Sequence, residues 1–229
     1  MASREDYGTY SIHIEGRWSL GDLYVFPRAY EQVYFALEAI LPAPDSETNQ
    51  RIERAFRAFP WRGGYSAVSF YNQLKWATPP RERPEVASIH YSSPGWMEFA
   101  LLVPLAYSVA AVVNKVADTI YNCNRVYNAI YSDMQKRELL KIEIERKKIG
   151  LKSDEIELIK DYSDTMAAIM GLNKPDQIHE RTKDPLISLK ILFSIFRRVR
   201  TLAEYKNMGK AQFHDSKELK NDNPDVSLF

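Results

Sequence analysis

Alternating apolar and polar residues near the start of the chain predict a β-strand with one buried face. In "TYSIHIEG", residues 9–16, Ile12 and Ile14 fall on one side of an extended chain, whereas Ser11 and His13 fall on the other. A glycine then ends the alternation. We therefore expect a half-buried strand in this segment.

A second alternating segment, "EVASIHYSSPG", occupies residues 85–95 and ends in a Ser-Pro-Gly turn. Its two faces would carry Val86, Ser88 and His90 on one side, and Ala87, Ile89 and Tyr91 on the other. Two such strands would most simply pair in one small sheet packed on helices. Pairing would let His13 and His90 face each other, although a plain polar strand face is the simpler interpretation.

Apolar residues at intervals of three and four predict helices in the first third of the chain. One covers residues 23–40, with Asp22 as its cap and Pro27 in its first turn. "RIERAFRAF", residues 51–59, predicts a short amphipathic helix. Residues 63–76 fit a helix about as well as a bent strand, and we prefer the helix.

An apolar run at residues 96–116 predicts a helix buried in the protein, with a mild kink at Pro104. Between Glu98 and Lys115 lie sixteen uncharged residues. As a helix they span about 24 Å, short of the roughly 30 Å hydrocarbon core of a membrane. The apolar period also continues to Met134, as in a helix packed against protein. Insertion of residues 96–116 into a membrane is the alternative.

Two further helices are expected at residues 153–171 and 184–209, each with a capping residue at its start and a glycine at its end. The whole pattern predicts an α+β protein that is mostly α. It would have a small N-terminal sheet packed on helices, a long central helix and a helical C-terminal half. Residues 1–95 would form an α+β part and residues 96–210 a helical part of one continuous domain, and residues 211–229 a flexible tail.

The composition is typical of a folded protein, and the near-zero net charge excludes a strong electrostatic field around the molecule as a whole. The 229 residues are 45% hydrophobic, and 31 basic residues against 30 acidic ones give a net charge of +1. Affinity for nucleic acid or anionic lipid must then come from a local patch. A single cysteine and a charged N-terminal segment without an apolar signal core predict a cytoplasmic protein, with peripheral or inserted membrane association as the alternative.

Residue types used in catalysis and metal binding are present without a recognisable motif. The four histidines lie far apart and lack the spacing of a metal site: His13, His90, His179 and His214. Cys123 falls in an apolar helical stripe, where a free cysteine usually acts as a small core residue. We predict no catalytic residue, no metal site and no cofactor.

One segment nevertheless offers an enzymatic alternative. "IEIERK", residues 142–147, carries Glu143, Glu145 and Lys147, with Asp133 upstream. A metal-dependent nuclease carries carboxylates and a lysine in such an alternation on a strand. Most runs of this kind are solvated helix faces, so we keep the nuclease as an alternative only.

Basic residues gather on the last predicted helix beside a broad apolar stripe. They are Lys190, Arg197, Arg198, Arg200 and Lys206. We expect these five to form an anion- or partner-binding surface for a phosphate backbone, a nucleotide or a lipid headgroup. The competing interpretation is a docked helix whose basic residues pair with acidic neighbours.

In its organisation the chain resembles uncharacterised bacterial proteins with an N-terminal strand and helix, an SPG turn and a basic C-terminal helix. The resemblance rests on residues 10–16, 63–74, 88–95 and 186–209, less than half of the chain. It carries no activity and no functional residue. It suggests a role as partner or effector in a bacterial conflict or defence system.

The sequence therefore favours a non-enzymatic binding or regulatory protein that acts through helical surfaces. We expect a protein partner or self-association, and we keep nucleic acid or anionic lipid as ligands of the basic helix. The alternatives are a membrane-directed effector that inserts residues 96–116 and the metal-dependent nuclease.

Overall fold

Four antiparallel strands form one small sheet in the computed structural model, which describes residues 6–41, 46–57, 63–92, 94–141, 151–172 and 175–214. The strands are β1 (Tyr7–Ile14), β2 (Glu85–His90), β3 (Gly95–Leu102) and β4 (Ala211–Gln212), in the order β2-β3-β1-β4. β3 thus lies between the two strands that the sequence predicted to pair. Trp96 of β3 is the partner of His13 on one side and of His90 on the other, so the two histidines do not face each other.

A β-bulge interrupts β2 between Val86 and Ser88. Val86 pairs with Phe99 and Ile89 with Met97, so both apolar residues lie on the inner face although they are three positions apart. The predicted strict alternation, with Val86 and Ser88 on one face, is therefore wrong. An extra residue in one strand shifts all later side chains to the opposite face.

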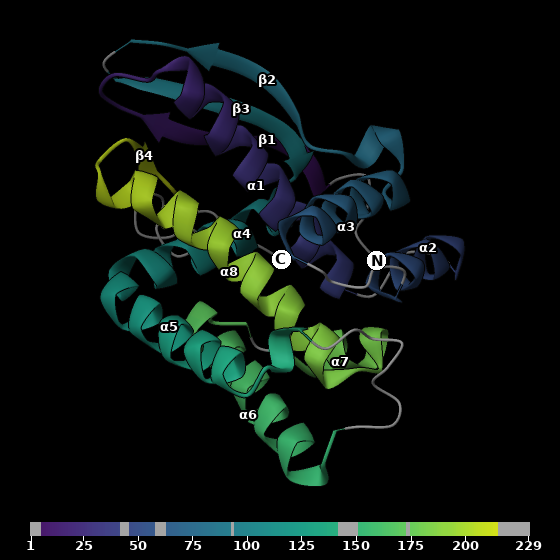
Figure 1. Ribbon diagram of the computed structural model, residues 1–229. Helices are drawn as coiled ribbons and strands as arrows, with labels where there is room; N and C mark the ends of the chain where they lie inside the picture. The colour runs from purple at the N-terminus through teal and green to yellow at the C-terminus, as the bar shows by residue number, and fades with distance from the viewer. Residues whose placement is uncertain are drawn as a thin grey trace, which may run out of the picture.

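Helices make up most of the chain and cover the inner face of the sheet (Figure 1). Their bounds are α1 Leu20–Ile40, α2 Ser46–Arg57, α3 Gly63–Ala77, α4 Val103–Asp118, α5 Ile120–Lys136, α6 Ser153–Met170, α7 Pro175–Thr182 and α8 Pro185–Asn207. Short 3-10 turns lie at Pro80–Glu82 and Leu139–Lys141. The predicted fold class, α+β and mostly α with a small sheet packed on helices, is confirmed.

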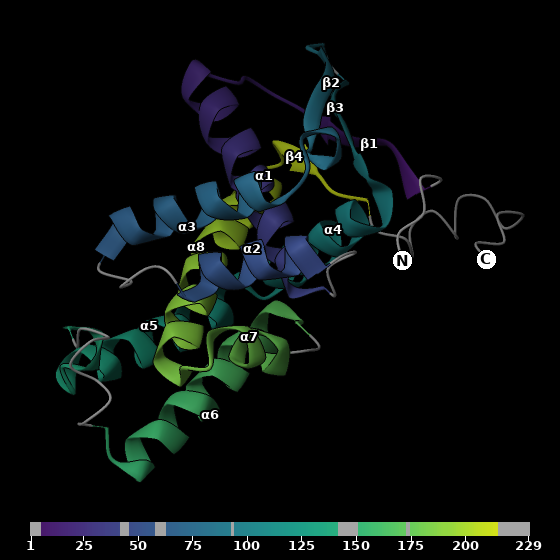
Figure 2. The same ribbon diagram turned by 90° about the vertical axis from the view of Figure 1, so that its right-hand side faces the viewer.

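The centre of the fold is α8. It runs between the sheet with α1 on one side and α5, α6 and α7 on the other, in both views (Figures 1 and 2), and it packs against α1, α4, α6 and α7. Residues 186–196 are buried without interruption. Asp184 caps the helix by accepting hydrogen bonds from the backbone nitrogens of Leu186 and Ile187 at 2.9 and 3.1 Å. A helix buried on all sides is a core element rather than a surface one.

The predicted helix over residues 96–116 is wrong in its first part, because residues 95–102 form β3. The sequence shows the reason: Met97, Phe99 and Leu101 are buried and alternate with half-buried residues, which is the period of a strand. Pro104 accordingly lies in the first turn of α4, where its missing N–H costs nothing, and does not kink a longer helix. Among the described residues, no helix has the length and apolarity needed to cross a membrane.

Three further details differ from the prediction. The long central helix is divided at Thr119, which ends α4 and precedes α5. Ser19, not Asp22, is the N-cap of α1, so Pro27 lies inside the helix beyond its first turn. Residues 211–212 of the expected flexible tail form β4 beside β1, and residues 215–229 lie outside the described part of the chain.

Candidate functional site

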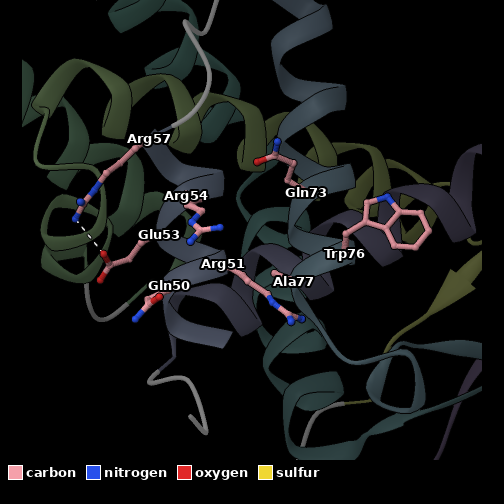
Figure 3. A pocket seen from close by; sticks show the side chains of 8 residues that line it. All are labelled: Gln50, Arg51, Glu53, Arg54, Arg57, Gln73, Trp76 and Ala77. Carbon is pink, nitrogen blue, oxygen red and sulfur yellow. Dashed lines mark ion pairs between the residues drawn. The ribbon is translucent and has the colours of Figure 1, made fainter. Parts of the chain in front are cut away.

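An open groove lies between α2 and α3, with a cavity volume of about 690 Å³ (Figure 3). Its walls carry side chains of both helices: Gln50, Arg51, Glu53, Arg54 and Arg57 from α2, and Gln73, Trp76 and Ala77 from α3. The lining combines cations, amides and one large aromatic ring. Such a mixture is typical of a binding surface rather than of a catalytic centre.

The amphipathic pattern of α2 fixes which residues reach the groove. Ile52, Ala55 and Phe56 are buried, and the ring of Phe56 meets that of Phe70 on α3 edge to face at 5.2 Å. This contact holds the two helices together. The residues at positions 51, 54 and 57 follow one another along the exposed side, because a spacing of three keeps side chains on one face of a helix.

Arg51, Arg54 and Arg57 form a row of arginines on the exposed side of α2. Two of the three are paired with glutamates of the same helix. Arg51 forms an ion pair with Glu47, and Arg57 lies 3.2 Å from Glu53 while donating from Nε to the carbonyl oxygen of Arg181 at 3.1 Å. Arg54, between them, is exposed and has no ion pair within the described chain. A guanidinium left without a carboxylate can bind one supplied from outside.

Trp76 is 68% exposed at the end of α3, an unusual position for so large an apolar side chain. The guanidinium of Arg83 lies 4.8 Å from the centroid of its ring, and Nε of Arg83 donates to the carbonyl oxygen of Thr78 at 3.1 Å. A cation placed near the ring in this way limits its rotation. The ring therefore stands at the groove in a defined position while remaining accessible.

The five basic residues predicted on the last helix are not brought together on one face. Each residue of a helix advances about 100°, so Arg198 and Arg200 point to nearly opposite sides of α8, and Lys206 lies about 160° around the helix from Lys190. All five are buried or half-buried: Lys190, Arg197, Arg198, Arg200 and Lys206.

Four of these five side chains have partners inside the protein. Arg197 donates to the hydroxyl of Tyr127 at 3.2 Å, and Arg200 and Lys206 lie 3.6 and 3.4 Å from Glu204 and Asp118. Arg198 donates to Oε1 of Gln32 at 2.9 Å and stacks its guanidinium 4.9 Å above the ring centroid of Tyr71. Burial lowers the pKa of Arg198 and of Lys190. Binding of an anion by this set stays a prediction, and the internal contacts favour a structural role.

The other residues weighed in the sequence also have ordinary surroundings. Cys123 is buried, with its sulfur 3.3 Å from the hydroxyl of Thr119 and 3.6 Å from the carbonyl oxygen of Ile169. Within the described residues no three His, Cys, Asp or Glu side chains are placed to hold a metal ion. Glu143 and Glu145 of the nuclease alternative lie outside the described residues.

One buried carboxyl group stands apart from the groove. Glu38, near the end of α1, accepts a hydrogen bond from the hydroxyl of Thr78 at 2.8 Å. Burial raises its pKa to about 7, against the opposing effect of the Thr78 hydrogen bond, and the nearby carboxylate of Glu82 adds to the increase. A carboxyl group of this kind gains or loses its proton near neutral pH.

The chain matches no protein-family model, and comparisons with curated proteins and with solved structures gave no match either. The candidate site is therefore defined by its geometry alone. Sequence reasoning missed the groove, although the arginines three apart in "RIERAFR" and the single tryptophan in residues 63–77 were the available signals.

Proposed function

We propose that the chain is a non-enzymatic binding protein that docks an acidic segment of a partner protein in the groove between α2 and α3. The observation that carries this proposal is the pairing pattern in the arginine row. Arg54 alone among the three lacks a carboxylate in the described chain, and it lines the same groove as the exposed Trp76.

The composition of the groove supports a protein ligand. Tryptophan and arginine are the residues that most often dominate the energy of protein–protein contacts. The amides of Gln50 and Gln73 can donate to and accept from a peptide backbone. A partner carboxylate opposite Arg54, next to an apolar side chain over Trp76, would use both kinds of contact at once.

A nucleic acid fits the same groove less well. Phosphate backbones are bound by several free cations, and each contact adds to the salt dependence of binding. Here Glu47 and Glu53 already neutralise two of the three arginines. A single free guanidinium is suited to one carboxylate rather than to a chain of phosphates. The role in bacterial conflict that the resemblance suggests stays a prediction.

The test uses fluorescence anisotropy with two labelled probes, a random copolymer of glutamate and tyrosine and a single-stranded twelve-nucleotide DNA. We expect the copolymer to bind, and Arg54→Glu to weaken its binding about tenfold or more because a like charge then faces the ligand. Trp76→Ala should weaken it similarly. Arg125→Glu on α5, an exposed arginine outside the groove, is the matched control and should change little.

The proposal fails if neither probe binds, or if binding of the copolymer is equally sensitive to Arg54→Glu and Arg125→Glu. Stronger binding of the DNA, lost in Arg54→Glu, would replace the protein ligand by nucleic acid. Thermal unfolding of each variant, followed by circular dichroism, verifies that the fold is retained.

A further inference from the structure

The edge strand β2 is open to solvent along its outer side. It pairs only with β3, and five of its six residues, 85–90, are exposed. Figure 1 shows it at the outer rim of the sheet. Edge strands are usually protected by lysine, proline or a covering element. The sequence of β2, "EVASIH", contains neither of these residues, and none of the described elements covers it.

The inner side of this edge is also incompletely covered. Val86 and Ile89 point toward the helical side of the sheet, yet each is 48% exposed. A cleft beside Val86 separates it from the N-terminal half of α1, where Tyr24 is 63% exposed. Apolar side chains next to free backbone N–H and C=O groups are the features to which another strand can add.

We propose that β2 pairs antiparallel with β2 of a second copy of the chain, so that the two four-stranded sheets become one sheet of eight strands. In the register that we assign, Glu85 lies opposite His90 of the second copy, Val86 opposite Ile89, and Ala87 opposite Ser88. Every pair occurs twice because the contact has a twofold axis.

The sequence of β2 is self-complementary in this register, and this favours a second copy over an unrelated strand. Glu85 and His90 both lie on the outer face, where their partners on β3 are Ala100 and Trp96. An acidic group thus meets a histidine at each end of the contact. Val86 and Ile89 both lie on the inner face, so an apolar residue meets an apolar residue there.

The bulge is compatible with this arrangement. A bulge usually discourages pairing at an edge because it is irregular on one strand only. Here the irregular position, Ala87, lies next to the twofold axis. Both strands then carry the same irregularity at the centre of the contact, and the regular residues on either side remain opposite one another.

Analytical ultracentrifugation of the full chain tests the assembly. We expect a concentration-dependent species of twice the 26.5 kDa chain mass. His90→Glu should weaken dimerisation about tenfold or more, because two glutamates then face each other at both ends. Combining it with Glu85→Lys should restore the dimer, since the introduced lysine faces the introduced glutamate. Tyr121→Lys, at an exposed tyrosine on α5, is the control for an added charge.

Disulfide formation tests the register. A mixture of Val86→Cys and Ile89→Cys chains should form a covalent heterodimer on mild oxidation, because directly opposite residues lie within the range of a disulfide. Either variant alone should form much less, since Val86 lies about 10 Å along the strand from Val86 of the second copy. The native Cys123 is buried and contributes little background.

A chain that stays monomeric at all concentrations would overturn the proposal. So would a dimer that His90→Glu leaves intact, which would place the contact elsewhere, or a dimer weakened by His90→Glu and not restored by the double variant. Equal cross-linking of the mixture and of either variant alone contradicts the register.

Discussion

The hydroxyl of Tyr205, near the end of α8, donates a hydrogen bond of 2.8 Å to Oδ1 of Asp22 in the first turn of α1. The other oxygen of Asp22 accepts from the backbone nitrogen of Ser19 at 2.8 Å and lies 2.9 Å from Nζ of Lys210. One carboxylate therefore completes the capping box of Ser19 and ties α1 to the end of α8. These contacts, with the Ser19 backbone first, lower the pKa of Asp22.

We expect Asp22→Asn to destabilise the protein by about 2 kcal/mol at pH 7, because the capping box and the hydrogen bonds from Tyr205 and Lys210 lose their charged acceptor. Because the pKa of Asp22 is lowered in the folded state, its stabilisation is present above the ordinary pKa of an aspartate and is lost as the pH falls. The difference in melting temperature between wild type and variant should therefore shrink toward pH 3. Tyr205→Phe, which removes only the hydroxyl, should cost about 1 kcal/mol. An unchanged difference at pH 3 would contradict the role of the charge.

The contribution of Glu38 to the stability of the fold should have the opposite pH dependence to that of Asp22. Its pKa is raised to about 7 in the folded protein by burial, so the folded state holds the proton more tightly than the unfolded state. Stability is then lost as the pH rises from the ordinary value near 4.5 to about 7, by about 3 kcal/mol. Glu38→Gln should remove this loss. Urea unfolding at pH 5 and pH 8 measures it, with the exposed Glu157→Gln as control, and an equal effect of Glu38→Gln at both values would be evidence against it.

Gly95, the first residue of β3, leaves no room for a side chain. A Cβ atom there would lie 2.7 Å from the carbonyl oxygens of His90 and Ser92, both of which belong to the backbone. We expect Gly95→Ala to cost about 2 kcal/mol or more, since main-chain atoms must move. Gly21→Ala in the first turn of α1, where the nearest atom is 3.4 Å away, should be neutral or slightly stabilising. Thermal melts of the two variants provide the comparison.

Arg198 and Arg200 should respond differently to substitution although they are neighbours in sequence. Arg198→Ala would leave the amide of Gln32, which is buried, without its guanidinium donor and would remove the contact with Tyr71, so we expect a loss of about 2 to 3 kcal/mol. Arg200→Ala removes a half-exposed ion pair with Glu204 and should cost under about 1 kcal/mol. Equal losses in urea unfolding would argue against the structural role of Arg198.

This difference also limits how anion binding by α8 can be tested. A variant with glutamate at positions 197, 198 and 200 would lose the internal contacts of Arg198 and report on folding. Arg200→Gln with Lys206→Gln, at residues whose partners lie near the surface, is the suitable pair. An anion affinity that survives this pair would not come from these two residues.

Periodicity predicted the helices of the first half and both helices that end in glycine, because their apolar stripes were long. Periodicity failed at residues 96–116, where one continuous apolar run covers both a strand and the helix that follows it. Met97, Phe99 and Leu101 satisfy the period of a strand, but the apolar residues after Pro104 continue the run and hide the boundary. The bulge at Ala87 could not be read from "EVASIH", since it depends on the register with β3. A local sequence does not contain that information.

The candidate groove was missed for a related reason. The basic residues of α8 stood out in the sequence because their number could be counted, whereas their partners Gln32, Tyr71 and Tyr127 lie in distant segments. The significance of Arg54 depends on two neighbouring ion pairs and on Trp76, which comes from another helix. The sequence alone does not distinguish an arginine that is paired inside the fold from one that is free to bind a partner.

The central position of α8 has a consequence for synthesis of the protein on the ribosome. The buried faces of α1 and α4 contact α8. β4, which pairs with β1, follows α8 in the sequence. Between Ile40, which ends α1, and Tyr205 the ribosome adds 165 residues, which takes roughly 10 to 30 s at ordinary elongation rates. During that time the buried side chains of α1 that pack against α8 lack this partner, although α1 can already contact α3 and α4 once those helices are made. The core can therefore be completed only after α8 has been synthesised, because α1, α4 and α6 all pack against it.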